Sequence, residues 1–251
     1  MSKLVVFGAT GYVGGRITEE ALRRGHTVVG VARKPEGLPA DVEARTGSLH
    51  DDGFIADVTK GADVIVVATP GRADEQGRRL LDVVPALADA ARAAGARLSF
   101  VGGAASLLVT PGGPRLLDTP DFPDTYKTEA TAQTEVLDAL RELPSDVEWF
   151  YLSPPAKFGA WTVGERTGSY RVGGDVLLSD AEGNSHIGGD DFAIAFVDEI
   201  EEPRATAARG SPSRTDARRG APRSRGAPAR VSPGNRRCRR TSWRGRGRAR
   251  W

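Results

Sequence analysis

A glycine-rich turn between a predicted strand and a predicted helix constrains this chain more than any other feature. The sequence VVFGATGYVGG occupies residues 5–15. Leu4–Phe7 is apolar throughout, as expected for a strand buried on both faces of a parallel sheet. Residues 12–24 follow, with apolar side chains at helical spacing. The order of strand, glycine turn and helix is typical of a dinucleotide-binding α/β domain.

The three glycines Gly8, Gly11 and Gly14 each have a distinct role in such a turn. The first permits backbone angles that other residues avoid, the second lets the backbone approach a pyrophosphate, and the third lets the helix lie against the strand. The free N–H groups of the helix N-terminus then face the phosphates, where Thr10 and Tyr12 add polar contacts. We therefore expect dinucleotide binding, the alternative being a purely structural turn.

Predicted strands and helices alternate along residues 1–204. Further strands are expected at 27–33, 62–70, 97–103 and 147–155, and further helices at 52–60, 78–95, 127–142 and 190–202. Pro85 is expected to kink the helix over 78–95. The alternation predicts βαβ units with right-handed crossovers, and hence a single α/β domain, a Rossmann-like doubly wound parallel sheet.

Residues 205–251 differ sharply from the rest of the chain. They hold 15 of the 35 Lys and Arg residues and one of the 33 Asp and Glu residues, so they carry +14 and residues 1–204 carry −12. Because the segment lacks apolar periodicity, we expect a disordered basic tail. An acidic domain has no electrostatic footprint for nucleic acid, whereas the tail is compatible with a nucleic-acid-binding arm or a merely solvated end.

A shift of reading frame is the third and favoured interpretation of the tail. One codon spelling of residues 205–213 (ATAARGSPS), read from its third base, encodes HRRARFTV, which ends as a plausible strand. On this hypothesis the tail is a frameshift product and the domain has lost its last strand. An exposed sheet edge and a lower stability would follow.

The end of the second predicted strand indicates which cofactor is bound. An acid there would bind the ribose 2′-hydroxyl of NAD, whereas an Arg accommodates the 2′-phosphate of NADP. Arg33 and Lys34 occupy this place, and the first acid is Glu36. The sequence favours NADP(H) over NAD(H), unless the two cations form only a solvated surface pair.

Small residues follow the later strands, at the carboxyl edge where ligands bind in this architecture. They leave room for a nicotinamide ribose, although Gly102 and Gly103 are equally consistent with a turn. The loops are 68–71, 102–106 and 153–155, which include Ala68, Thr69, Pro70, Ser153, Pro154 and Pro155.

Six stretches together resemble the NAD(P)H-flavin reductases, which are atypical short-chain dehydrogenase/reductases. This family is similar to biliverdin reductase B and often named NAD(P)-dependent epimerase/dehydratase. The resemblance covers residues 1–204, and DTPDFP and GERTGSYRVGGD are its distinctive parts. Its members commonly end in a strand like HRRRFTV after EEP, in agreement with the shifted frame. The stretches are VFGATGYVGGRITEEALRRGH, FVGGAASL, RLLDTPDFPDTYKTEATAQTEVLDALR, LSPPAKF, GERTGSYRVGGDVLL and DDFAIAFVDEIEEP.

The resemblance also implies roles for individual residues. Ser48 and Leu49 fall where relatives place an Asp and an apolar residue against adenine, so this chain departs from the family pattern there. The remaining implied contacts are Gly8, Thr10, Gly11, Tyr12, Val13 and Gly14 with the pyrophosphate, Arg33 with the 2′-phosphate, Ala68, Thr69 and Pro70 with the ribose, Gly103 and Ser106 with the nicotinamide, and Pro154 and Pro155 as a pocket wall.

The Tyr-x-x-x-Lys pair that many short-chain dehydrogenases use for proton transfer is absent. Tyr126 is followed four residues later by Ala130, and Lys127 is adjacent and therefore on another helix face. Tyr151 and Tyr170 have no Lys at that spacing either. We interpret Tyr126 as a surface or lid residue. The absence fits hydride transfer to a flavin-like ring, whose product anion is delocalised and takes its proton from water.

The sequence therefore predicts an NADPH-dependent reductase of flavins or similar planar acceptors. Ser106 is the candidate for a polar contact to the acceptor, unless its hydroxyl bonds its own backbone. Phe122, Phe158 and Trp161 could stack on the acceptor, or pack in the core or a lid. A non-catalytic NADP(H)-binding redox sensor remains an alternative, and a nucleotide-sugar epimerase or dehydratase would need the missing Tyr–Lys pair.

Other sequence features indicate where the protein is located and what it does not bind. His26, His50 and His186 lack metal-ligand spacing, so no metal site is expected. No apolar run approaches the roughly 18 residues of a membrane helix, no signal peptide is evident, and a single cysteine cannot form an internal disulfide. We expect a cytoplasmic protein, a monomer or weak dimer, with a small-molecule acceptor and no membrane or nucleic-acid partner for its folded domain.

Overall fold

The computed structural model describes residues 1–162, 164–203 and 208–210. One sheet runs through the molecule in the order β3-β2-β1-β4-β5-β6-β7. Strands β1 to β6 are parallel, and β7 pairs antiparallel with β6. The strands are β1 (Lys3–Phe7), β2 (Thr27–Ala32), β3 (Glu43–Thr46), β4 (Val64–Val67), β5 (Arg97–Val101), β6 (Trp149–Leu152) and β7 (Ala208–Gly210).

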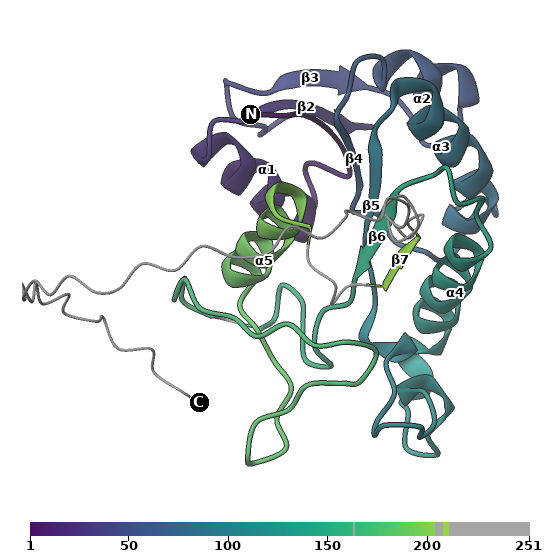
Figure 1. Cartoon of the computed structure of the whole chain (residues 1–251), viewed down its shortest axis with the longest axis vertical. Coiled ribbons are helices and arrows are strands. Elements are labelled where there is room, and N and C mark those ends of the chain that lie inside the picture. Colours follow the sequence, from purple (N-terminus) through teal and green to yellow (C-terminus); the bar gives the residue numbers. More distant parts are fainter. Residues whose placement is uncertain (163, 204–207, 211–251) are drawn as a thin grey trace, which may run out of the picture. The chain divides into compact units, whose positions relative to one another are not determined.

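Helices cover both faces of the sheet, as Figure 1 shows. One face carries α1 and α5, which pack against each other, and the other carries α2, α3 and α4. The predicted Rossmann-like doubly wound fold is confirmed. The helices are α1 (Tyr12–Arg23), α2 (Asp52–Val58), α3 (Leu80–Ala94), α4 (Asp124–Arg141) and α5 (Gly189–Glu201), with short 3₁₀ turns η1 (Ala104–Ser106) and η2 (Leu116–Asp118).

The sheet separates two apolar cores. Because side chains alternate along a strand, Val5 and Phe7 of β1 enter the core beneath α2, α3 and α4, whereas Leu4 and Val6 enter the core beneath α1 and α5. All four of these side chains are at most 1% exposed. This two-sided burial explains why the first strand is apolar at every position.

Several predicted strands extend too far, and strands β3 and β7 were not predicted. The predicted strands over 62–70, 97–103 and 147–155 include loop residues beyond the ends of β4, β5 and β6. Strand β3 lies at the sheet edge with mostly exposed side chains, so its sequence EART carries no apolar signal. Pro85 lies inside α3, and the expected kink stays a prediction.

The structure places β7 inside the segment predicted to be disordered. Tyr151 faces Ala208, Phe150 faces Arg209 and Trp149 faces Gly210 across the β6–β7 pair. The expectation of disorder is therefore wrong for residues 208–210, whereas the loss of the strand that the shifted frame would encode stays a prediction. Strand pairing uses backbone groups, so Ala-Arg-Gly pairs without a side-chain pattern that could predict it. The compact unit that contains the sheet runs from Met1 to Pro212. The frameshift hypothesis and the rest of the predicted tail lie outside the described residues.

Membrane and metal sites can be assessed only for the residues that the structure describes. Within them, no helix combines the length and apolarity needed to cross a bilayer. Within the same residues, no three or more His, Cys, Asp and Glu side chains are grouped to hold a metal ion.

Candidate cofactor-binding site

The glycine turn joins β1 to α1 through a close backbone approach. Gly8 has a φ of +83° and donates its N–H to the carbonyl of Val31 at 3.0 Å. A Cβ on Gly8 would lie 2.4 Å from the carbonyl oxygen of Ala68, and one on Gly14 would lie 2.1 Å from that of Gly8. Only hydrogen fits at these two positions, so the fold itself requires both glycines.

Gly11 is less confined and marks the N-terminus of α1. A Cβ there would lie 3.2 Å from the carbonyl oxygen of Gly8, which leaves its outer side more open than those of Gly8 and Gly14. No side chain caps α1, and no acid lies in its first turn. The partial positive charge of this helix end is therefore available to an anion. By contrast, Asp51 caps α2 by accepting the N–H of Phe54 at 2.9 Å.

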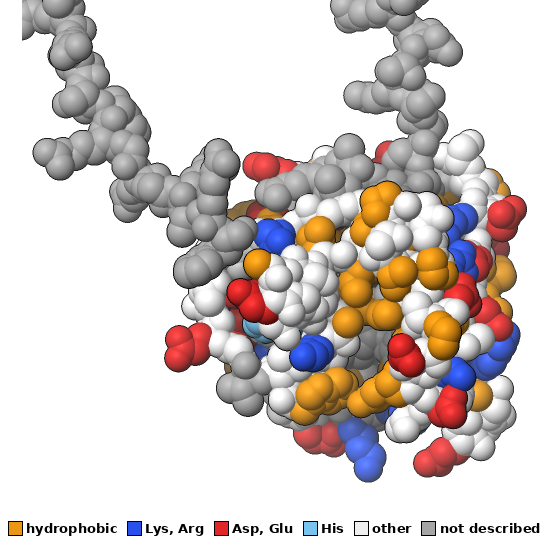
Figure 2. Space-filling model, turned by 90° about the horizontal axis from the view of Figure 1, so that it is seen from below, with side chains coloured by type: hydrophobic (Ala, Val, Ile, Leu, Met, Phe, Trp, Pro, Cys, Tyr) orange, Lys and Arg blue, Asp and Glu red, His pale blue; other side chains and the backbone are white. Residues whose placement is uncertain are grey.

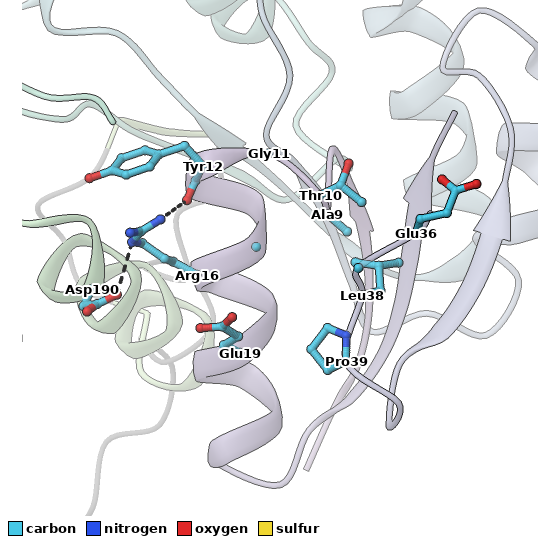
Figure 3. Close-up of a pocket in the computed structure, with 12 residues that line it drawn as sticks. Ala9, Thr10, Gly11, Tyr12, Arg16, Glu19, Glu36, Leu38, Pro39 and Asp190 are labelled. Carbon is cyan, nitrogen blue, oxygen red and sulfur yellow. Dashed lines mark hydrogen bonds and ion pairs between the residues drawn. The ribbon is translucent and has the colours of Figure 1, made fainter. Parts of the chain in front are cut away.

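A cavity of about 610 Å³ opens in front of this helix end. Thr10, Gly11 and Tyr12, all predicted to contact the pyrophosphate, line it. Figure 3 shows Leu38 and Pro39 on one side of α1 and Asp190 on the other. The complete lining is Ala9, Thr10, Gly11, Tyr12, Gly15, Arg16, Glu19, Glu36, Gly37, Leu38, Pro39 and Asp190.

Tyr12 is held at the mouth of the cavity by charged and aromatic neighbours. The guanidinium of Arg16 lies 4.1 Å from the centre of the Tyr12 ring, donates to the Tyr12 carbonyl at 2.9 Å, and pairs with Asp190 at 3.2 Å. The ring of Phe158 meets that of Tyr12 edge-on at 5.9 Å and that of Phe192 at 4.7 Å. Phe158, one of the predicted acceptor-stacking residues, thus packs between the glycine turn and α5. Val13, the remaining predicted pyrophosphate residue, packs against the core beneath α1.

Arg33 and Lys34 are exposed and follow β2 immediately. They are outside the cavity lining, but Glu36, Leu38 and Pro39 of the same connection are part of it. Neither the Arg33 nor the Lys34 side chain makes a hydrogen bond or ion pair with another described residue. Their charge therefore has no internal partner in this part of the chain.

Ser48 and Leu49 lie in the loop between β3 and α2. The hydroxyl of Ser48 accepts the N–H of His50 at 3.1 Å, which supports the local turn. Leu49 packs against the core beneath α2, α3 and α4. Neither residue lines the cavity, and their contact with the adenine stays a prediction.

Beyond β4, a carboxylate that the sequence interpretation missed holds the loop 68–72. Glu129 of α4 accepts the N–H groups of Gly71 at 2.7 Å and Arg72 at 3.1 Å. Gln133, one helical turn further on, donates its side-chain N–H to the carbonyl of Thr69 at 3.3 Å. The spacing of four residues on the predicted helix was the available signal, since it places both side chains on one face.

Beyond β5 and β6, a buried tyrosine joins the strand ends. The hydroxyl of Tyr151 donates to the carbonyl of Gln133 and accepts the N–H of Gly103, both at 3.0 Å. Burial raises the pKa of the Tyr151 phenol, so it stays protonated near neutral pH. A Cβ on Gly102 would lie 2.0 Å from the Tyr151 ring, so this glycine has a packing role.

The hydroxyl of Ser106 forms a hydrogen bond with the nearby backbone, which is the alternative to an acceptor contact. Its hydroxyl donates to the carbonyl of Gly103 at 3.1 Å, and the residue is 7% exposed. Its availability to an acceptor stays a prediction. The other predicted loop residues lie at the same carboxyl edge: Ala68, Thr69 and Pro70 after β4, and Ser153, Pro154 and Pro155 after β6.

Aromatic side chains lie beyond the strand ends on this edge. Trp161 is 70% exposed and Tyr126 is 53% exposed, whereas Phe122 is half-buried just before α4. Figure 2 shows apolar side chains around a hollow on the face seen from below in Figure 1. Lys127 pairs with Asp124 at 2.6 Å rather than with Tyr126, so α4 carries no Tyr–Lys proton-transfer pair.

Comparison with known proteins supports the cofactor assignment. A family model described as "NAD(P)H-binding" matches residues 8–203. The "Uncharacterized protein YwnB" of Bacillus subtilis is 38% identical over an alignment of 210 residues that covers 80% of this chain and 93% of that protein.

Solved structures of similar proteins cover the same part of the chain. A "Putative exported protein" from Burkholderia pseudomallei is 41% identical, with a TM-score of 0.71, covering 83% of this chain and 98% of the other. A "putative epimerase" from Bacteroides thetaiotaomicron is 32% identical, with a TM-score of 0.72 and coverages of 84% and 97%. A "putative NADH-flavin reductase" from Streptococcus pneumoniae is also 32% identical, with a TM-score of 0.67 and coverages of 81% and 95%. A cytoplasmic location stays a prediction.

Proposed function

This chain belongs to the NAD(P)H-binding family, and we propose that within it the protein is a reductase that uses NADPH to reduce a flavin or a similar planar acceptor. Two features taken together support the proposal: the N-terminus of α1 is uncapped and faces an open cavity, and α4 has no Tyr–Lys pair that could donate a proton. The first provides a place for a pyrophosphate. The second favours an acceptor that needs no enzyme-bound acid.

Arg33 and Lys34 support NADPH over NADH. They follow β2, where an Arg accommodates the 2′-phosphate, and they have no partner among the described residues. A 2′-phosphate placed there would meet two positively charged side chains that do not first have to break hydrogen bonds or ion pairs within the described residues. Leu38 and Pro39 supply an apolar wall for the adenine on the same side of the cavity.

The residues of the chain act by binding and orientation. The N–H groups at the start of α1 hold the pyrophosphate, and the loops after β4 and β5 hold the nicotinamide half. When bound, NADPH supplies a hydride. The acceptor would receive that hydride and take its proton from solvent, so the residues of the chain need only bind and orient the two molecules.

Steady-state oxidation of NADPH tests the proposal. With FMN, riboflavin and a quinone as acceptors, we expect turnover above that of free cofactor with at least one of them. Binding of NADPH without turnover would favour the redox sensor. Activity on a nucleotide sugar without net NADPH oxidation would favour an epimerase, the activity named for one similar structure.

A further inference from the structure

Gln133 carries a buried polar atom with no partner. It lies on α4 and is 7% exposed. Its side-chain carbonyl oxygen, Oε1, is one of two buried side-chain N or O atoms that lack a hydrogen bond among the described residues. The other is the hydroxyl of Thr18, inside α1. Because buried polar groups are nearly always hydrogen-bonded, such an atom requires an explanation.

The neighbours of Gln133 fix the orientation of its amide. Its Nε2 donates to the carbonyl of Thr69 at 3.3 Å and to the carboxylate of Glu129 at 3.2 Å. Both of these oxygens can only accept hydrogen bonds. A flipped amide would place Oε1 against two acceptors, so the present orientation is the favourable one. Oε1 is consequently held as an acceptor that awaits a donor.

The position of Gln133 in the fold identifies the donor. The strand order reverses between β1 and β4, so a dinucleotide that crosses this point places its adenosine over β1 to β3 and its nicotinamide over β4 to β6. Gln133 lies between the loops that follow β4 and β5. Its amide bonds Thr69, and a Cβ on Gly103 would lie 3.4 Å from its own Cβ.

We propose that Gln133 is a cofactor-binding residue whose Oε1 accepts a hydrogen bond from the nicotinamide half of the bound dinucleotide. The donor is an N–H of the carboxamide or a hydroxyl of the adjoining ribose. This inference rests on the proposed function. Glu129 acts as a positioning residue, because it holds the Gln133 amide in the accepting orientation. An amide cannot supply a proton, so Gln133 orients the cofactor without serving as an acid.

The test compares two ligands on the full chain and on its Gln133→Met variant. Methionine keeps the length of the side chain but neither donates nor accepts comparably. The ligands are NADPH and adenosine 2′,5′-bisphosphate, which lacks the nicotinamide half. Loss of one hydrogen bond is expected to weaken NADPH binding about 3- to 10-fold, with the affinity for the bisphosphate unchanged. Thr131→Ala, an exposed change on the same helix, is the matched control and is expected to alter neither affinity.

The outcomes separate this inference from the proposed function. Equal weakening of both ligands would mean that the substitution loosens the whole site, and the inference would be wrong. Unchanged NADPH binding by Gln133→Met would also overturn it, while the proposed function stood. If the unaltered chain binds neither ligand, the proposed function fails and this contact fails with it.

An analogue of NADPH with an acetyl group in place of the carboxamide distinguishes the two donors. If the carboxamide N–H is the donor, the unaltered chain binds the analogue more weakly than NADPH, and Gln133→Met does not discriminate between them. If the donor is a ribose hydroxyl, Gln133→Met weakens NADPH and the analogue by the same factor.

Discussion

The two halves of the carboxyl edge are built in opposite ways. Over β1, β2 and β3, an uncapped helix end faces an open cavity and two cations have no partner among the described residues. Over β4, β5 and β6, Glu129, Gln133 and Tyr151 bond the loops to one another. The first half can attract an anion without giving up internal bonds. The second resembles a rigid frame, which suits the half of the cofactor whose reacting atom must be oriented.

The largest effect is expected from filling the glycine turn. In Gly14→Ala the new Cβ would lie 2.1 Å from the Gly8 carbonyl oxygen, so the backbone must shift. We expect a loss of about 3 kcal/mol in the free energy of unfolding, measured in urea, and a loss of NADPH binding. Gly15→Ala is the control, because its Cβ would make only a 3.4 Å contact and Ala favours helix. Similar stabilities for the two variants would contradict this account of the turn.

A smaller effect is expected from cutting the link between α1 and the loop after β6. Glu20 is 3% exposed, pairs with Arg23, and also pairs with Arg24 at 2.8 Å and with Arg166 of that loop at 2.9 Å. Glu20→Gln should lower the free energy of unfolding at pH 7 by about 2 to 3 kcal/mol, because Arg23 and Arg166 lose their carboxylate partner while Arg24 keeps Asp198 and Glu201.

The same link should be sensitive to acid. Burial opposes the charged form of Glu20, but hydrogen bonds from Arg166 and Arg24 outweigh it and lower its pKa. The carboxylate therefore stabilises the fold above its unfolded pKa of about 4.3, and this contribution is lost as the pH falls through the folded pKa. Urea unfolding from pH 7 to pH 3 should show the difference from Glu20→Gln shrinking below pH 4. A difference independent of pH would exclude this role.

The next prediction concerns Arg33 and Lys34, the two cations on the open half of the carboxyl edge. Arg33→Ala combined with Lys34→Ala should weaken NADPH binding about 10-fold or more and leave NADH binding unchanged, because only NADPH carries the 2′-phosphate. Arg92→Ala removes an arginine already paired with Asp146 at 2.8 Å and should change neither affinity. Equal weakening of NADPH and NADH would argue against a 2′-phosphate contact.

The smallest effect is expected at Tyr126. The side chain is 53% exposed, and the neighbouring Lys127 pairs with Asp124. Tyr126→Phe should alter kcat/KM for NADPH oxidation by less than about twofold, since a group that takes no part in the transition state contributes nothing to this ratio. A fall of 100-fold would identify Tyr126 as the missing acid.

Local sequence patterns predicted the parts of the molecule whose structure is determined by residues close together in the chain. The apolar run Leu4–Phe7 and the glycine turn located β1 and α1, and Thr10, Gly11 and Tyr12 do line a cavity. Strands β3 and β7 could not be predicted, because an exposed edge and a backbone-only pairing leave no side-chain pattern.

The missed parts of the candidate site depend on tertiary contacts. Leu38 and Pro39 line the cavity because the connection after β2 folds back toward α1. Gln133 is an ordinary polar residue in the sequence, and only the neighbouring loops reveal its unpaired oxygen. The sequence left Phe158 between acceptor stacking and core or lid packing, because its contacts with Tyr12 and Phe192 join residues far apart in the chain.

Titration of the full chain with NADPH and NADH, followed by the fluorescence of the reduced nicotinamide, tests the central claim most directly. We predict saturable binding of both, with NADPH bound at least about 10-fold more tightly because Arg33 and Lys34 meet its 2′-phosphate. Equal affinities would contradict the assignment of these two residues. No binding of either nucleotide by the folded chain would contradict the assignment of the glycine turn and cavity as a dinucleotide site.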